Sequence, residues 1–198
     1  MKIDSKQIRI KLKSYYEKAF SYFIPIFVKE GLHSNFFSIT VLVLCSICAI
    51  LLFADGVGQA GLAGILAAAS DIMGSMVAEK RDDKESRRAL VDSITDLYSE
   101  IIFYTGIAVF FIQAEKAYFA IFAYLCLVGS LMTVFIMVRA RQFGYDVAHG
   151  FIHRPERFAI ISLGMFFGPY GLAVASILIA IVANYTASRM IWDIWFTD

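Results

Sequence analysis

The chain has 198 residues, of which 59% are hydrophobic and 18% are charged, and its mean hydropathy is +0.68. Soluble domains average about 45–50% apolar and about 25% charged residues, so this composition excludes an ordinary soluble domain and indicates a polytopic membrane protein. The net charge is only +1, and no overall basic character argues for a nucleic-acid partner.

The N-terminal segment has the pattern of a helix that lies on a membrane surface. Apolar and aromatic residues recur at helical spacing over residues 5–27, with lysines between them. This pattern predicts an N-terminal amphipathic interfacial helix, and we expect Pro25 to end or kink it. We assign residues 1–30 to this juxtamembrane helix and residues 31–198 to one transmembrane domain. A cleaved signal peptide is not expected.

Apolar segments predict an all-α membrane protein with six transmembrane helices. The first four cover residues 36–53, 57–78, 89–112 and 117–138, and crossing a bilayer takes about 20 residues. The last apolar region, residues 158–183, is long for one span and short for two. Because Gly168-Pro169-Tyr170-Gly171 in its middle is typical of a turn, we expect a fifth, unusually short span followed by a sixth.

The basic residues are distributed asymmetrically about these spans. Lys116 alone lies on one side, whereas the other 17 of the 18 Lys and Arg residues fall in the N-terminal segment, the second and fourth loops and the C-terminus. The positive-inside rule then places both termini and the even-numbered loops in the cytoplasm, in a bacterial-type inner membrane or its equivalent. Cys45, Cys48 and Cys126 lie in apolar runs, which is typical of packing residues.

Three carboxylates occur near the cytoplasmic ends of the second and third spans. Asp92 and Asp96 are four residues apart and therefore share a helix face, about 6 Å from each other. Antiparallel pairing of the two spans would bring Asp71 to a similar depth, where ionisable groups are costly and mark functional sites. Oxygen ligands suit Mg²⁺ or Mn²⁺, which bind phosphates and diphosphates. Alternatively, these carboxylates cap helices or pair with Lys80, Arg87 or Arg88.

The stretch from residue 71 to residue 96 resembles the signature of the CDP-alcohol phosphotransferases, D-x2-D-G-x2-A-R-x8-G-x3-D-x3-D. The matching positions are Asp71, Ala78, Asp92 and Asp96. The departures are Gly74 for the second Asp, Ser75 for the first Gly, Glu79 for the Arg and Arg88 for the second Gly. Residues 139–141, 150–157 and 184–189 are similar to other segments of the family, so the resemblance covers most of residues 31–190.

The resemblance implies a six-span homodimeric enzyme of phospholipid biosynthesis. Such an enzyme transfers a substituted phosphate from a CDP-linked lipid such as CDP-diacylglycerol to an alcohol or a phosphorylated polyol and releases CMP. The chain is most similar to phosphatidylinositol-phosphate-synthase-like members. In active members, four Asp residues hold two divalent ions against the CDP diphosphate, and the last Asp is the base.

Specific roles follow from that resemblance. Asp96 would be catalytic, and Asp71, Ala78 and Asp92 would bind the CDP moiety. The metal ligands would be Asp71, Asp92 and Asp96. An anionic acceptor would be bound by Arg139, Arg154 and Arg189.

The altered signature leaves alternatives open. Glu79 follows Asp71 by eight residues and lies within about 80° of it on a helix, so it is a candidate replacement ligand. Loss of the second Asp at Gly74 should weaken a metal position, which also fits a non-catalytic homologue that binds a lipid or nucleotide or partners an active paralogue. A transporter or channel is less well supported, because transport sites are expected near the membrane midplane.

Overall fold

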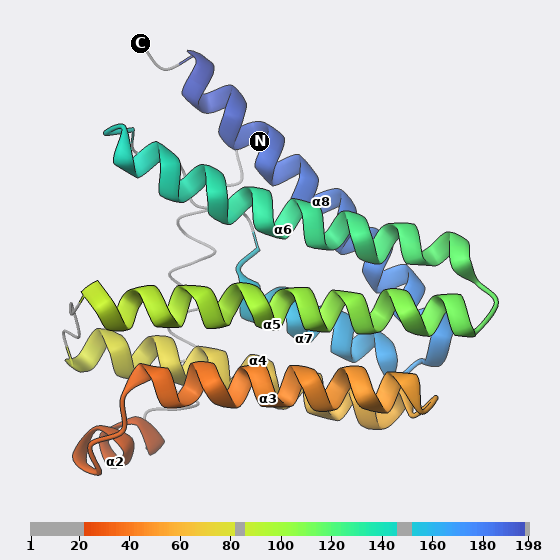
Figure 1. Ribbon diagram of the computed structural model, residues 1–198, viewed down its shortest axis with the longest axis horizontal. Coiled ribbons are helices and arrows are strands. Elements are labelled where there is room, and N and C mark those ends of the chain that lie inside the picture. The colour runs from red at the N-terminus through yellow and green to blue at the C-terminus, as the bar shows by residue number, and fades with distance from the viewer. Residues whose placement is uncertain (1–21, 82–85, 146–151, 197–198) are drawn as a thin grey trace.

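The computed structural model describes residues 22–81, 86–145 and 152–196, which form helices and the turns between them (Figure 1). The helices in chain order are α2 (Phe23–Lys29), α3 (Ser34–Phe53), α4 (Val57–Arg81), α5 (Ser86–Gln113), α6 (Ala117–Gln142), α7 (Arg154–Met165) and α8 (Gly168–Phe196).

The helices form one bundle in which the short α7 has a central position. Helix α3 packs against α4 and α5, α4 packs against α7, and α5 packs against α6. Helix α8 packs against both α6 and α7. In Figure 1, α6 and α8 diverge from the α3–α5 layer toward the C-terminus. The N-terminal end of α7 therefore faces the carboxylate-bearing ends of α4 and α5.

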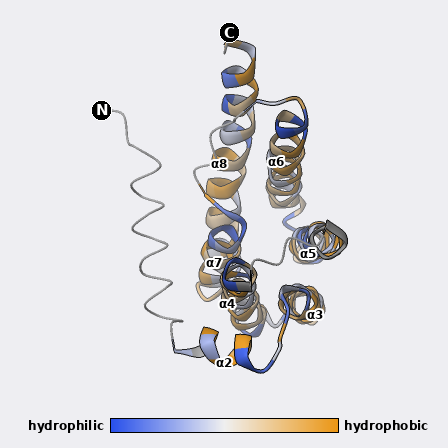
Figure 2. Cartoon of the chain, turned by 90° about the vertical axis from the view of Figure 1, so that its left-hand side faces the viewer, coloured by the Kyte–Doolittle hydropathy of each residue, from blue (hydrophilic) through white to orange (hydrophobic). Residues whose placement is uncertain are grey.

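Within the described residues, five helices are long and apolar enough to cross a membrane: α3, α4, α5, α6 and α8. Figure 2 shows hydrophobic colour along these helices, and large apolar side chains such as Ile50, Leu62 and Ile181 are exposed on them. The short fifth span that the sequence predicts corresponds to α7, whose 12 residues extend only about 18 Å, against a hydrocarbon core of about 30 Å. The structure thus supports an integral membrane protein with six helices at the predicted positions, one of them too short to cross a bilayer by itself.

Two predicted helix boundaries differ from the structure. Helix α7 ends at Met165 and α8 begins at Gly168, with φ of 75° at Gly168, so the turn precedes the predicted Gly168–Gly171 segment. Pro169 instead lies in the first turn of α8, where a missing N–H costs no helical hydrogen bond.

Most of the predicted N-terminal amphipathic helix lies outside the described residues. Helix α2 continues past Pro25 to Lys29. Ile24 of α2 is fully buried and packs with Phe37 of α3 and Val77 of α4. The last part of the N-terminal segment is therefore anchored to the bundle beside α4.

Small residues allow close packing between helices. A Cβ atom on Gly61 of α4 would lie 2.9 Å from the carbonyl oxygen of Ser162 in α7. A Cβ atom on Gly106 of α5 would lie 2.7 Å from the Cβ of Ala49 in α3. The three cysteines are buried, in agreement with their expected packing role.

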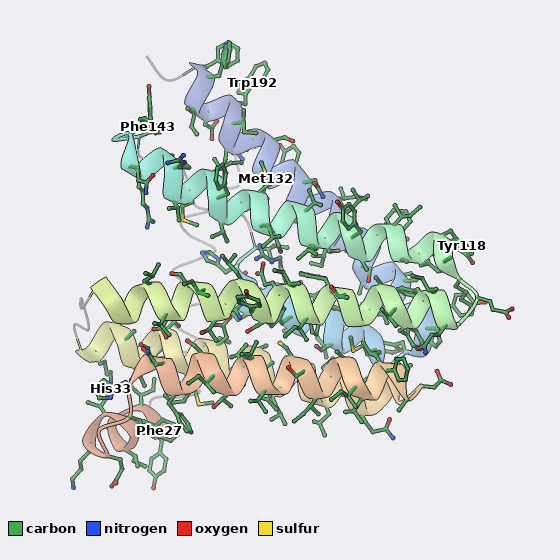
Figure 3. All side chains as sticks on the ribbon, in the orientation of Figure 1. Phe27, His33, Tyr118, Met132, Phe143 and Trp192 are labelled. Carbon is green, nitrogen blue, oxygen red and sulfur yellow. The ribbon has the colours of Figure 1, made fainter. Side chains whose placement is uncertain are left out.

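Aromatic side chains lie near both ends of the bundle. Tyr118 lies at the end opposite to His33 and Phe143, and Trp192 lies near the C-terminus of α8 (Figure 3). Aromatic residues are enriched where a membrane protein meets the lipid headgroups. This arrangement is consistent with helices that run from one membrane surface to the other.

Candidate active site

The candidate site is formed by α4, α5 and α7. Asp71 comes from α4, and Asp92, Asp96 and Glu100 follow one another at intervals of four along α5. This spacing places the three α5 carboxylates on one helix face. Helix α7 contributes Arg154, which lies opposite that face.

Arg154 forms ion pairs with three carboxylates from two helices. Its Nη1 atom lies 2.5 Å from Oδ1 of Asp96 and 3.4 Å from Oδ1 of Asp71. Its Nε atom lies 3.8 Å from Oε1 of Glu100. The Arg154 side chain is only 13% exposed, so these interactions occur in a largely desolvated environment.

The charge of Arg154 is maintained by its surroundings. Arg154 is the first residue of α7, outside the five candidate spans. Burial by itself would lower the pKa of its guanidinium group, but Asp71, Asp96 and Glu100 raise that pKa above its ordinary value. Arg154 is therefore a permanent cation at the centre of the carboxylate group.

The start of α7 fixes where Arg154 lies. The backbone N–H of His153 donates a hydrogen bond to Oε2 of Glu156 at 2.8 Å, which satisfies a donor at the helix start as in a capping box. Pro155 follows Arg154 in the first turn, where its restricted φ favours the helix. The Arg154 guanidinium also lies over the ring of Phe158, 5.3 Å from the ring centre.

A second buried ion pair joins α5 to α7. Nη2 of Arg157 donates to Oε1 of Glu100 at 2.8 Å, and these side chains are only 6% and 2% exposed. Glu100 and Arg157 were not among the predicted site residues, although Arg157 lies in the 150–157 segment that is similar to the family. The continued spacing of four from Asp92 through Asp96 to Glu100 was the available sequence signal.

Asp92 has a different partner from Asp96. Its Oδ2 atom accepts a hydrogen bond from the hydroxyl of Ser34, the first residue of α3, at 2.6 Å. Its Oδ1 atom is buried and has no hydrogen-bond partner in the described part of the chain. The structure therefore brings Asp71 and Asp96 together around Arg154, while Asp92 contacts the start of α3.

Gly74, which replaces the second Asp of the signature, lies where α4 meets α3. A Cβ atom at this position would lie 2.8 Å from the Cβ of Phe37 and 3.9 Å from the carbonyl oxygen of Ser34. Real Cβ atoms essentially never approach another heavy atom this closely. A carboxylate at position 74 would therefore require α3 to move.

A cavity of about 300 Å³ opens beside the ion pairs. Its polar lining includes Asp71, Asp96, Glu100, Arg154 and Arg157. Thr133 and Met137 of α6 contribute to the opposite wall. The cavity thus combines carboxylates, guanidinium groups and apolar surface in one space.

Other predicted site residues lie elsewhere. Arg139 donates to Gln142 at 3.0 Å, and Arg189 pairs with Asp193 at 4.0 Å. Neither lines the cavity, and neither do Ala78 and the exposed Glu79. The side chain of Arg88 lies outside those that the structure describes.

The alternative that the carboxylates pair with Lys80, Arg87 or Arg88 stays a prediction, because the side chains of Arg87 and Arg88 lie outside those that the structure describes. Asp71 and Asp96 do pair with an arginine, but that arginine is Arg154 of α7. The expected partners Lys80, Arg87 and Arg88 all precede or open α5, whereas Arg154 is more than 50 residues later in the chain.

The donor chemistry of the site fits a hard divalent cation such as Mg²⁺ or Mn²⁺. Asp71 and Asp92 each present a buried carboxylate oxygen without a hydrogen-bond partner in the described residues. Within residues 22–81, 86–145 and 152–196, however, no three His, Cys, Asp or Glu side chains form a group arranged to hold a metal. The arrangement pairs Asp71 and Asp96 with Arg154 instead.

No family model matches the sequence. An uncharacterized protein of Aquifex aeolicus is 23% identical over 151 residues, which cover 76% of this chain and 77% of that relative.

Crystal structures of Mycobacterium tuberculosis phosphatidylinositol phosphate synthase (PgsA1) are similar over most of the chain. The structure with CDP-DAG bound has a TM-score of 0.73 at 21% identity, covering 87% of this chain and 92% of PgsA1. The complex with manganese and citrate has a TM-score of 0.72 at 22% identity and covers 87% of each chain. The resemblance drawn from the sequence is therefore confirmed at the level of the fold: this chain has the membrane fold of the CDP-alcohol phosphotransferases.

Proposed function

We propose that this protein transfers a substituted phosphate from a CDP-linked lipid to an alcohol and releases CMP, as a step in membrane phospholipid synthesis. The observation that carries this proposal is the convergence of Asp71, Asp96 and Arg154 on one cavity. This cavity lies in a fold shared with a synthase that was crystallised with CDP-DAG. CDP-diacylglycerol is accordingly the proposed donor.

In the proposed reaction, Asp96 accepts the proton of the acceptor hydroxyl. The hydroxyl oxygen attacks the β-phosphorus of the CDP-lipid and forms a new P–O bond. The bond between the β-phosphorus and the oxygen that bridges the two phosphates breaks, and CMP leaves with that bonding electron pair. Asp96 serves as the general base because it lines the cavity from α5.

A divalent ion is part of this proposal. Asp71, Asp92 and Asp96 would hold Mg²⁺ or Mn²⁺, and the ion would neutralise negative charge on the diphosphate. The PgsA1 structure with manganese is consistent with such a cofactor. Glu79 is a weaker candidate ligand, because it is exposed on α4 and does not line the cavity. Ala78, which the resemblance assigns to the CDP moiety, lies beside it.

The acceptor is proposed to be anionic, such as inositol phosphate or another phosphorylated polyol. Arg154 lies at the cavity, and a guanidinium group can bind phosphate through two hydrogen bonds. Arg139 and Arg189, near the C-terminal ends of α6 and α8, are proposed to attract the acceptor from the cytoplasmic side. Their present partners are Gln142 and Asp193.

A second candidate function is lipid or nucleotide binding without catalysis, in a homodimer or beside an active paralogue. The packing of Gly74 against Phe37 favours it, because the missing signature carboxylate cannot be restored without moving α3. In this case the cavity would bind a CDP-lipid whose diphosphate stays intact.

One assay separates the two candidates. Purified protein in detergent is given CDP-diacylglycerol, Mn²⁺ and a panel of alcohols, and both CMP and lipid products are quantified. Release of CMP in equal amount to a new phospholipid supports the transferase. Saturable binding of CDP-diacylglycerol without CMP release for any acceptor would establish the binding function and overturn the transferase proposal.

A further inference from the structure

We infer that Arg157 is a positioning residue that keeps one edge of the Arg154 guanidinium free for the phosphate group of an anionic acceptor. It does so by holding the Glu100 carboxylate, which would otherwise pair with that edge. This inference rests on the proposed function, because it concerns the acceptor side of the same cavity. It adds which edge of Arg154 faces the phosphate and which residue keeps that edge open.

The first observation is that only one of the three guanidinium nitrogens of Arg154 is engaged by hydrogen bonds. Nη1 lies 2.5 Å from Asp96 and 3.4 Å from Asp71. Nε and Nη2 are buried and have no hydrogen-bond partner among the described residues. These two nitrogens lie on the same edge of the planar group, so their N–H bonds can bind two oxygens of one phosphate. Arg154 therefore brings an unused phosphate-binding edge to the cavity that it lines.

The second observation is that a carboxylate stands beside this edge without closing it. Oε1 of Glu100 lies 3.8 Å from Nε of Arg154, which is about 1 Å longer than an N–H···O hydrogen bond. Oε2 of Glu100 is buried and has no hydrogen-bond partner in the described part of the chain. Buried polar groups without partners are costly, so Glu100 and the edge of Arg154 would gain from pairing with each other. A third group must therefore hold Glu100 back.

The third observation is that Arg157 supplies this restraint. Its Nη2 atom donates to Oε1 of Glu100 at 2.8 Å, and hydrogen bonds in which both groups are charged are short and strong. Arg154 and Arg157 are three residues apart on α7, so they are neighbours on the helix surface and compete for the same carboxylate. The short bond belongs to Arg157, and the Nε–Nη2 edge of Arg154 stays open.

Direct contact between Arg157 and the phosphate is the competing role. Nε of Arg157 also lacks a hydrogen-bond partner within the described residues, and Arg157 also lines the cavity. Its side chain is only 6% exposed, against 13% for Arg154, so Arg154 is the more accessible guanidinium. The two roles differ in one respect: holding Glu100 back matters only while Glu100 is present, whereas direct contact with phosphate does not depend on Glu100.

The test is a double-mutant cycle at positions 100 and 157, with calorimetric titration of inorganic phosphate into the purified full-length protein. Arg157→Gln should bind phosphate about tenfold more weakly, because phosphate must then displace Glu100 from Arg154. In the Glu100→Gln background, the same change should alter the affinity by no more than about twofold. An equal loss in both backgrounds would assign Arg157 to direct contact and overturn the inference. Absence of phosphate binding by the wild type would overturn it as well.

The double variant Glu100→Gln with Arg157→Gln keeps the test decisive if Arg157→Gln alone fails to fold. It leaves neither charge buried without its partner, so it avoids the main cost of breaking a buried ion pair. It should bind phosphate at least as tightly as the wild type, and a loss of about tenfold would contradict the role of Arg157 in holding Glu100. Lys116→Gln, near Tyr170 at the other end of the bundle, is the matched control for a lost positive charge and should leave phosphate binding unchanged.

Two further measurements identify the source of the phosphate and separate this inference from the proposed function. Saturating CDP-diacylglycerol should leave the binding of inorganic phosphate intact, whereas loss of that binding would assign the edge to the donor diphosphate and overturn the inference. In assays of CMP release, Arg157→Gln should raise KM for a phosphorylated acceptor about tenfold and leave KM for CDP-diacylglycerol unchanged. The expected phosphate cycle without CMP release would overturn only the proposed transferase. CMP release with equal losses of phosphate affinity in both backgrounds would overturn only this inference.

Discussion

At the scale of single residues, the site depends on a few carboxylates whose roles differ. Asp71 and Asp96 share Arg154, whereas Asp92 accepts a hydrogen bond from Ser34. Residues that look equivalent in the sequence therefore have different partners. Their substitution should have different consequences.

Asp96→Asn should abolish proton acceptance while keeping the size of the side chain. If Asp96 is the general base, the rate of CMP release should fall by about 100-fold or more. CDP-diacylglycerol binding should change less than the rate, because the base acts on the acceptor. Asp55→Asn, the same change in the turn after α3, should keep the wild-type rate. Equal rates for wild type and Asp96→Asn would exclude Asp96 as the base.

Gly74→Ala should destabilise the protein because the new Cβ would overlap the side chain of Phe37. Overpacking of this kind costs about 1–3 kcal/mol. Gly58→Ala in the same helix has open space around the new Cβ, so it should be neutral or stabilising by up to about 1 kcal/mol. Thermal denaturation in detergent would compare the two variants.

The same packing predicts that Gly74→Asp will not restore a functional signature. The larger side chain meets Phe37 and the start of α3, which also carries Ser34. An active and stable Gly74→Asp protein would show that α3 can move away from α4. It would also support a site that decayed recently.

At the scale of elements, the position of α7 is the central feature. This helix is too short to cross the membrane alone, yet it contributes Arg154 and Arg157 to the site. Its apolar residues, including the fully buried Phe158 and Ile161, pack into the main core. Helix α7 thus serves mainly to place two guanidinium groups opposite α5.

Glu100→Gln should weaken the packing of α7 on α5 because Arg157 would lose its buried counter-charge. Breaking one partner of a buried ion pair typically costs about 3–5 kcal/mol. The double variant Glu100→Gln with Arg157→Gln should lose less stability than the two single variants added together. Glu30→Gln, an exposed position after α2, is the control for thermal denaturation, and a Glu100→Gln protein as stable as wild type would contradict this role.

At the scale of the whole molecule, orientation in the membrane is open to a direct test. The distribution of Lys and Arg predicts that the α6 C-terminus is cytoplasmic and that the α5–α6 turn lies on the opposite side of the membrane. A cysteine at Glu115 should therefore react with an impermeant maleimide added to intact cells. A cysteine at Phe143 should react only after the cells are opened, and the opposite pattern would reverse the proposed topology. The native cysteines are buried and provide a low background.

The sequence by itself determined the membrane class, the positions of the helices and the resemblance to a family fold. Hydrophobic segment length was sufficient to locate the long helices, because each span must satisfy its own backbone hydrogen bonds in lipid. The spacing of Asp92 and Asp96 also showed correctly that they share one helix face. The end of α7 was less predictable, since apolar residues continue through Phe166 and Phe167 into α8.

Only the tertiary structure decided which charges meet. Arg154 reaches Asp71 across 83 positions of sequence, and Ser34 reaches Asp92 across 58. These contacts depend on how α3, α4, α5 and α7 pack, which local periodicity does not encode. The same packing explains Gly74. In the sequence it is a missing carboxylate, and in the structure a Cβ atom at this position would overlap Phe37 of α3.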